Sequence, residues 1–442
     1  MGEAWRVVVV LGALAISGCQ DPATRPVDAG RPPKMDACSG LQCRQVDCAL
    51  EGKAPTTLTG TVYAPNETLA LFGVDVYVPN LDPGPFQAGV SCERCNPTLP
   101  GEPITNTRSA EDGTFTLTNP PVGTDIPLIV TTGKWRRIVT IPEVLPCVEN
   151  ELPKALTRLP RNKQEGDLPQ IAIVTGLCDA LECLVRNLGV AESEFTNDTG
   201  DGRVHLFTEG GSATTMSGQT LNRASTSLWK DLDKMKQYDL QLNSCECGRN
   251  GENKPQEAMD IMKAYADGGG RVFLSHYHHV WLEGIEGGQA PAVWPEIATC
   301  QADNVAGTVD IIDQNENPRG TSFAKWMLAV GGSTTLGEIM ITEGKETCSA
   351  IDADKAERWV YTKIGRRPQN FQFTTPQEAE LADRCGKVVF SDMHVASGSL
   401  SMGAFPAGCK AATDPLTPQE KALAFMFFDI ATCIDDISKP SR

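Results

Sequence analysis

Residues 255–279 read PQEAMDIMKAYADGGGRVFLSHYHH, and this stretch decides the fold class of the second half of the chain. A helix is predicted from Pro255 to Ala266, because proline suits a first helical turn and three consecutive glycines follow the helix end. Arg271 to Ser275 is a short apolar run typical of a buried strand. A helix that leads directly into a buried strand indicates an α/β unit.

Five other stretches continue this alternation of strands and helices. Strands are predicted at residues 170–176, 238–245 and 387–391, and amphipathic helices at 179–188 and 417–434. Together they predict an α/β flavodoxin-like domain over residues 168–435. In such a domain helices cover both faces of a mostly parallel sheet.

Residues 54–150 follow a period of two instead, which is typical of half-buried strands. An Asp112-Gly113 turn stands directly before one alternating run. The predicted strands lie at residues 57–63, 73–79, 114–117, 126–132 and 136–141. Their spacing predicts a small all-β sandwich. The chain is therefore expected to be multidomain, with a charged linker at 151–167 and a short tail at 436–442.

The composition indicates the cellular compartment of the chain and argues against one class of partner. The chain has 442 residues, enough for about two to three domains. Its 39 basic and 56 acidic residues give a net charge of −17, so phosphate backbones would repel it and nucleic acid is not an expected partner. Sixteen cysteines indicate an oxidising compartment. If Cys19 is modified, fifteen remain, and an odd number leaves at least one thiol free or paired between chains.

The N-terminus predicts the location. Residues 7–17 form an apolar run of eleven, too short to span a bilayer but suited to a signal peptide over residues 1–18. The small residues before Cys19 resemble the lipobox of bacterial lipoproteins, which implies lipidation at Cys19. Gln20 in the next position implies the outer membrane by the same resemblance. The expected location is the cell envelope, with attachment through acyl chains. The alternative is a plain signal peptide with an accidental cysteine.

Cysteine spacing suggests local disulfides elsewhere. Residues 19–53 form a proline-rich tether that contains Cys38, Cys43 and Cys48. A small disulfide knot is favoured there over a metal knuckle, since no histidine is near and the spacing is not a usual zinc pattern. Cys92 and Cys95 form a C-x-x-C among prolines, which favours a loop disulfide over a redox motif.

The first domain resembles a known family. The segments Gly60-Thr-Val62, Gly73-Val-Asp-Val76 and Asp112-Gly-Thr-Phe115, followed by Pro121 and Gly123, resemble a carboxypeptidase-regulatory-like domain. The resemblance implies a prealbumin-like sandwich over residues 54–150 that is accessory and not catalytic.

The second domain resembles the class I glutamine amidotransferase-like superfamily, and within it the ThuA-like branch. The similarity rests on Tyr238-Asp-Leu, on Tyr265 to Gly270, on the strand that runs into His276, and on Gly386 to His394. It covers about half of residues 168–435. The whole chain is also similar to lipoproteins of myxobacteria-like predators, in which the same two domains are joined.

That superfamily places a nucleophilic cysteine at a tight turn between a strand and a helix. The matching segment here, residues 274–279, contains no cysteine and carries bulky residues where glycines are expected. The departure puts amidotransferase chemistry in doubt. Ser275 could act as a nucleophile only if a base and an oxyanion hole converge on it.

Histidine is scarce, and its placement suggests a site. Three of the five histidines lie within residues 276–279, and His394 follows another strand. Strand alternation would put His276 and His278 on one side, and likewise Asp392 and His394. These four side chains could hold zinc or another divalent metal. Alternatively His276, Asp392 and His394 could act with Ser275 in acid–base catalysis. A structural role for all of them is the third interpretation.

Two functions from different classes follow. The first is a non-catalytic binding or structural module of the cell envelope, whose partner is a cell-surface ligand or protein. The second is a secreted hydrolase that uses the strand-end histidines, with the sandwich as a targeting module. Convergence of the histidines and Asp392 on an open pocket would favour the second.

Overall fold

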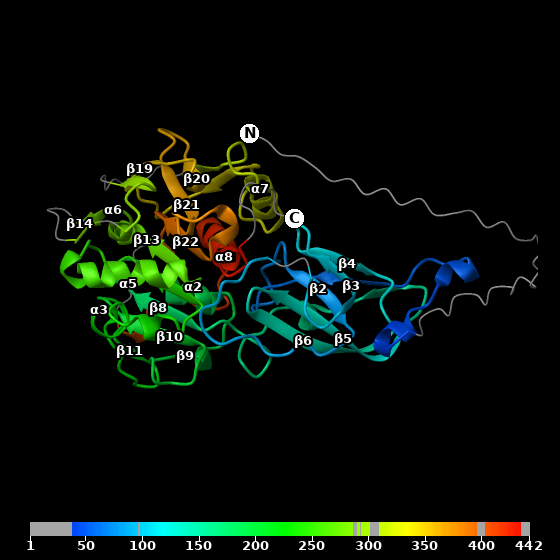
Figure 1. The fold of residues 1–442 in the computed structure, drawn as a ribbon. Coiled ribbons are helices and arrows are strands. Elements are labelled where there is room, and N and C mark those ends of the chain that lie inside the picture. Colours follow the sequence, from blue (N-terminus) through cyan, green and yellow to red (C-terminus); the bar gives the residue numbers. More distant parts are fainter. Residues whose placement is uncertain are drawn as a thin grey trace, which may run out of the picture. The chain divides into compact units, whose positions relative to one another are not determined.

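The computed structural model describes residues 38–95, 98–285, 290–291, 293–300, 309–395 and 403–434 (Figure 1). Cys19, the predicted signal peptide and the predicted tail at 436–442 lie outside the described residues. Residues 1–39 and 40–442 are separate units, and the helices and strands belong to the second. Both predicted kinds of structure, a β-rich first part and an α/β second part, are present in it.

The β-rich part contains two sheets whose inward side chains share one core. One sheet has the order β3-β2-β5-β6 and the other β4-β1-β7. Phe115 and Leu117 alternate with exposed residues along β4, and they join Val76 and Val130 from the other sheet in the same hydrophobic cluster. The strands are β1 Thr57–Thr61, β2 Asp75–Pro79, β3 Pro103–Arg108, β4 Thr114–Thr118, β5 Gly123–Thr132, β6 Trp135–Val144 and β7 Glu149–Glu151.

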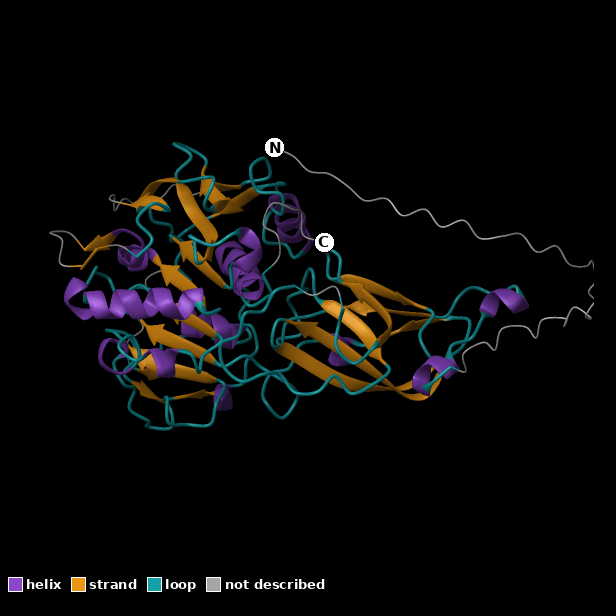
Figure 2. Cartoon of the chain, viewed as in Figure 1, coloured by secondary structure: helices purple, strands orange, loops and turns teal. Residues whose placement is uncertain are grey.

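The α/β part is built on a ten-stranded sheet with the order β18-β17-β20-β21-β22-β13-β12-β8-β10-β9 (Figure 2). Its strands are β8 Ile171–Thr175, β9 Phe195–Thr196, β10 Val204–Thr208, β12 Leu240–Asn243, β13 Arg271–Ser275, β17 Val309–Ile312, β18 Glu338–Met340, β20 Glu357–Thr362, β21 Pro368–Thr375 and β22 Gly386–Ser391. The last six strands in this order, from β22 to β9, run parallel to one another.

The other four strands of this sheet pair antiparallel, so the expectation of a mostly parallel sheet holds only for its parallel half. The physical reason lies in the connections. Only five residues separate β20 from β21, and a link that short allows a hairpin but no crossover. Short pairs outside the large sheet are β11 Thr214–Thr215 with β23 Ala404–Phe405, β14 Gly284–Ile285 with β15 Ala290–Pro291, and β16 Ala298–Cys300 with β19 Cys348–Ile351.

Helices cover both faces of the parallel half. Val272 and Leu274 of β13 pack in the cluster that contains helix α5, whereas Phe273 packs in the cluster that contains helix α8. Because successive strand residues face opposite sides, α5 and α8 lie on opposite faces of the sheet (Figure 1). α8 begins with Thr417 and Glu420 capping each other's backbone amides, and Pro418 stands in its first turn. Among the described residues no helix combines the length and the apolar composition needed to cross a membrane.

The helices are α1 Lys154–Thr157, α2 Leu181–Asn187, α3 Ala224–Ser227, α4 Leu232–Met235, α5 Gln256–Asp267, α6 Val280–Glu283, α7 Gly320–Ala329 and α8 Pro418–Ile430. The 3-10 turns are η1 Gly40–Arg44, η2 Cys48–Glu51, η3 Glu192–Glu194, η4 Gly251–Asn253, η5 His276–His279 and η6 Leu381–Asp383.

The predicted linker is packed against both parts. Leu159 is fully buried, and the guanidinium of Arg158 bonds the carboxylates of Glu67 and Glu165 at 2.6–2.8 Å. One hydrophobic cluster runs from the strands of the β-rich part to β8, α2 and α8. Residues 151–167 therefore act as a packed joint whose buried centre is residues 157–160.

Disulfides connect segments that are far apart in the sequence. The pairs are Cys48–Cys147, Cys92–Cys385, Cys95–Cys433, Cys178–Cys247, Cys183–Cys409 and Cys300–Cys348. The predicted loop disulfide between Cys92 and Cys95 is wrong, because each of these cysteines faces a different segment of the α/β part. The predicted knot is wrong for Cys48, which bonds Cys147 instead. Cys245 is the free cysteine of the described residues.

Candidate functional site

Three side chains converge at one edge of the large sheet. β22, β13 and β12 are adjacent parallel strands, so their carboxyl ends meet at that edge. Cys245 follows β12, His276 follows β13 and His394 follows β22. Their sulfur and ring nitrogen atoms lie within 4.8 Å of one another, and all three side chains are buried. The prediction that His276 and His394 approach each other is thereby met, with 5.2 Å between their ring centroids.

The backbone turn at His276 sets this arrangement. β13 ends at Ser275 and the 3-10 turn η5 begins at His276, whose φ of 45° lies in the left-handed region that non-glycine residues rarely adopt. Strand alternation stops at this turn. The expectation that His276 and His278 share a side is therefore wrong, because it assumed an extended backbone.

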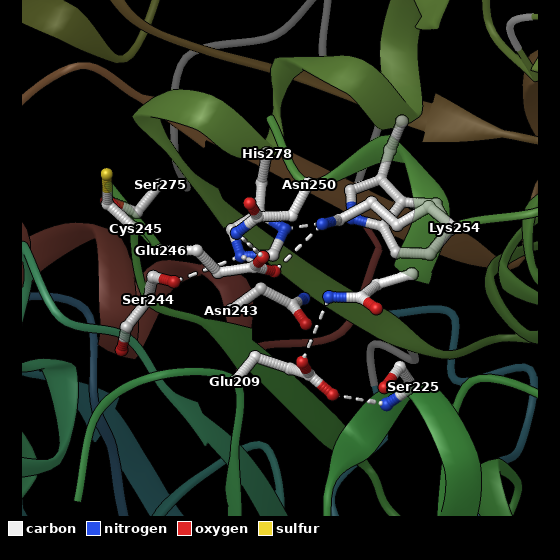
Figure 3. A network of polar contacts seen from close by, with 12 residues as sticks. Glu209, Ser225, Asn243, Ser244, Cys245, Glu246, Asn250, Lys254, Ser275 and His278 are labelled. Atoms are coloured by element: carbon white, nitrogen blue, oxygen red, sulfur yellow. Dashed lines mark hydrogen bonds and ion pairs between the residues drawn. The ribbon is translucent and has the colours of Figure 1, made fainter. Parts of the chain in front are cut away.

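His278 belongs to a different, fully buried network (Figure 3). Its Nδ1 accepts a hydrogen bond from the Trp281 indole at 3.0 Å, so its Nε2 carries the proton and donates to the Ser244 carbonyl at 3.0 Å. The carboxylate of Glu246 lies beside it and pairs with Lys254 at 2.9 Å. Burial lowers the pKa of His278 well below its usual value, which keeps the ring neutral.

The side chains of Asp392 and Ser275 also make their hydrogen bonds outside the cluster of Cys245, His276 and His394. The Asp392 carboxylate accepts from the backbone amide and the hydroxyl of Thr347, both at 2.8 Å. The Ser275 hydroxyl donates to the carboxylate of Asp179 at 2.6 Å. The four residues that the sequence predicts as ligands of one metal therefore do not all come together. His276 and His394 do, and the third member of their cluster is Cys245, not His278 or Asp392.

Cys245 is the functional candidate that sequence reasoning missed. The spacing of Cys245 and Cys247, with one residue between them, predicts that each bonds a distant cysteine; Cys247 bonds Cys178, whereas Cys245 is free. The only signal of a free thiol was the odd number of cysteines that remains if Cys19 is lipidated. Its sulfur lies 3.3 Å from Nδ1 of His276. In Figure 3 the sulfur points away from the network of Glu246 and His278. Burial raises the pKa of the Cys245 thiol to about 12, and the charges of Asp179 and Glu246 add to the rise.

A cavity of about 330 Å³ lies elsewhere in the same unit, where the β-rich part meets the α/β part. The surface of its walls is largely apolar, and the aromatic residues among them are Phe72, Tyr77, Phe86, Trp326, Trp359, Phe425 and Phe428. The hydroxyl of Tyr77 and the indole nitrogen of Trp359 are buried and have no hydrogen-bond partner among the described residues. Burial raises the pKa of Tyr77 to about 12, so its hydroxyl keeps a proton to donate.

Four arginines line the cavity, and two of them, Arg136 and Arg319, also contact its aromatic residues. Arg136 lies 4.2 Å from the ring centre of Phe86 and pairs with Asp167. Arg319 lies 4.7 Å from the ring centre of Trp359 and pairs with Glu357 and Asp429. Both guanidinium groups hold aromatic walls in place by cation–π contact.

Comparison with known proteins gives no family. No family model matches this chain, and no curated protein matches it. Two solved structures, a C-terminal and an N-terminal interface mutant of a type II cohesin–X-dockerin complex from Acetivibrio cellulolyticus, resemble parts of it. Each is 13% identical with a TM-score of 0.16; they cover 34% and 33% of this chain and 79% and 78% of their own chains. At such TM-scores the likeness carries no argument.

Proposed function

We propose that this chain is a non-catalytic binding lipoprotein of the cell envelope, and that it holds a small, largely apolar ligand in the cavity between its two parts. The observation that carries the proposal is the aromatic cavity with two unpaired donors, Tyr77 and Trp359. Small-molecule sites are typically concave and mostly apolar, with a few polar groups that fix orientation and volumes of about 300–1,000 Å³.

The two donors suggest the chemistry of the ligand, although both atoms have almost no accessible surface, so neighbouring side chains must shift before a ligand can bond to them. A buried donor without a partner costs about 1–3 kcal/mol, which a ligand acceptor would recover. A pure hydrocarbon would leave both donors unpaired. The cavity therefore favours an aromatic or alicyclic molecule that carries hydrogen-bond acceptors such as carbonyl, carboxylate or sulfonate oxygens.

The walls of the cavity are held covalently. Cys95 and Cys433 both line it and are bonded to each other, and Cys92–Cys385 ties the same loop to the start of β22. A site fixed before binding loses less conformational freedom when the ligand enters. Disulfides next to the cavity thus support a preformed binding site.

The finer fold assignments belong to the same proposal. A prealbumin-like, carboxypeptidase-regulatory-like sandwich over residues 54–150 is supported by two sheets with a common core. An amidotransferase-like, ThuA-like domain over residues 168–435 is supported by the parallel half-sheet and by the strained turn at His276. The superfamily's cysteine is absent from that turn, so no amidotransferase activity is proposed.

A hydrolase is the second candidate, and one contact favours it. The thiol of Cys245 lies 3.3 Å from His276, the pairing that activates a cysteine nucleophile. However, the side chain of Cys245 is fully buried and its raised pKa keeps the thiol protonated. Reactive cysteines are partly exposed thiolates, so binding remains the proposal that the geometry supports best.

A fluorescence titration tests the binding proposal. Anilinonaphthalene sulfonate has an aromatic body with acceptor oxygens, whereas N-phenylnaphthylamine has a similar body without them. The wild-type chain is expected to bind both. Tyr77→Phe should weaken sulfonate binding about five-fold, since one net hydrogen bond contributes about 1 kcal/mol, and should leave the amine unaffected.

Two controls sharpen this experiment. Tyr63→Phe removes the same hydroxyl from a tyrosine that does not line the cavity and should change neither affinity. Leu99→Trp enlarges a lining residue and should weaken both probes. Saturable binding that is indifferent to Leu99→Trp, or no binding at all, would refute a ligand site in this cavity.

A further inference from the structure

Cys245, His276 and His394 form a second site, apart from the cavity and with different chemistry. We infer that these three side chains bind one thiophilic metal ion, zinc(II) or copper(I), through one sulfur and two imidazole nitrogens. This metal site goes beyond the proposed ligand binding and does not depend on it.

The distances suit a single ion. With bonds of about 2.3 Å to sulfur and about 2.0 Å to nitrogen, a tetrahedral ion holds sulfur and nitrogen ligands roughly 3.5 Å apart. Sulfur of Cys245 and Nδ1 of His276 are 3.3 Å apart, and all three ligand atoms lie within 4.8 Å. Small side-chain rotations are therefore enough to close the site.

Rigid elements supply the ligands. Each of the three residues follows one of three adjacent parallel strands, β12, β13 and β22, whose register is fixed by backbone hydrogen bonds. His276 is additionally held by its left-handed backbone conformation. Sites carried by packed strands hold ligand geometry better than sites on loops.

The donor atoms select the class of metal. A thiolate with two imidazoles suits zinc and copper, whereas calcium and magnesium prefer oxygen ligands. The carboxylate of Asp179 acts electrostatically on Cys245 and favours a cation there, whereas the charge of Glu246 is offset by Lys254. On binding, one metal–sulfur and two metal–nitrogen bonds form and the thiol proton passes to solvent, so affinity should increase with pH.

The disulfides formed by the other cysteines also support a metal site at Cys245. Among the described residues fourteen cysteines are in disulfides, and the free thiol of Cys245 lies beside two imidazoles. In an oxidising compartment a persistent thiol needs protection, which both burial and a bound metal provide.

Metal titration of the full chain with its disulfides formed tests the inference. Zinc(II) and anaerobic copper(I) are added in separate arms, cobalt(II) serves as a spectroscopic probe and magnesium(II) as the control ion. One equivalent of cobalt should give thiolate-to-cobalt charge-transfer absorption, and magnesium should not compete. Preference between zinc and copper in direct competition identifies the ion.

Three variants assign the ligands. Cys245→Ser should abolish the charge-transfer band, and Cys245→Ser or His394→Ala should lower metal affinity at least about 100-fold, because changes beyond the direct ligands already cost 10–100-fold. His205→Gln changes a histidine that is not among the three ligands and should retain wild-type affinity.

The wild-type chain decides the question if these variants do not fold. X-ray absorption at the edge of the bound metal should report one sulfur neighbour together with nitrogen. A stoichiometric site with only nitrogen and oxygen neighbours, or no stoichiometric binding of either ion, would overturn the inference.

Discussion

Asp310 shows at the scale of one residue how this fold treats buried charge. Its side chain on β17 is fully buried, and neither carboxylate oxygen has a hydrogen-bond partner among the described residues. Burial, with the charges of Glu346 and Asp392, raises the pKa of Asp310 to about 7. Arg319, by contrast, is half-buried and is paired with Glu357 and Asp429. The free-energy cost of burying an unpaired carboxylate therefore arises at Asp310, and it depends on pH.

The sign of that dependence follows from proton binding. Between about pH 4 and pH 7 the unfolded carboxyl has lost its proton while the folded one still holds it, so folding stability falls as pH rises. Asp310→Asn should therefore increase the free energy of unfolding by up to about 4 kcal/mol at pH 8, and by less than about 1 kcal/mol at pH 4. Urea unfolding at the two pH values measures the difference.

The exposed Asp414 provides the matched control. Asp414→Asn should change stability little at either pH. An equal gain from Asp310→Asn at pH 4 and pH 8 would show that Asp310 does not carry the raised pKa.

At the scale of an element, the connection between β2 and β3 acts as a strap onto the α/β part. Its disulfides end beside β22 and beyond α8, across sequence separations of 293 and 338 residues. Between the two cysteines the Arg94 guanidinium donates to the carbonyls of Leu381 and Arg384 at 2.8–2.9 Å. The same loop borders the cavity. The strap therefore has two roles: it stabilises the fold and it shapes the proposed ligand site.

Removing one disulfide of the strap should affect both properties. The double variant Cys95→Ser/Cys433→Ser is expected to lose about 2–5 kcal/mol of unfolding free energy, because the reduced chain gains conformational freedom when unfolded. It should also bind anilinonaphthalene sulfonate several-fold more weakly. Equilibrium urea unfolding and the probe titration measure the two effects.

The disulfide Cys183–Cys409 is the control, since it closes a loop of 226 residues and neither cysteine lines the cavity. Cys183→Ser/Cys409→Ser should lower stability by a similar amount and preserve probe affinity. Equal loss of affinity in both double variants would mean that the strap does not shape the site.

At the scale of the whole molecule, one hydrophobic core joins parts that the sequence presents as separate domains. The cluster includes Leu58 from β1, Ile171 from β8 and Leu423 from α8. The packed joint at residues 151–167 fixes the approach of the two parts, which the cavity between them requires. The net charge of −17 still predicts that nucleic acid is not a partner, because phosphate backbones would repel the chain.

The membrane anchor is the prediction that belongs to this scale. Several acyl chains on Cys19 would give stable attachment, whereas the apolar run before it is too short to span a bilayer. Cys19→Ala should leave an uncleaved or soluble chain. Partitioning between detergent and aqueous phases compares it with the wild type. A Cys19→Ala chain that matures and enters the detergent phase normally would exclude lipidation at this residue.

The sequence by itself determined the features that depend on near neighbours. The apolar periods located β13, α5 and α8. Only the tertiary structure decided which cysteine is free, where Cys92 and Cys95 pair, and that Cys245 joins His276 and His394. Periodicity reports which face of an element is buried. Disulfides across hundreds of residues, the strained turn that separates His276 from His278, and a cavity between two parts depend on how distant segments pack, which no local pattern encodes.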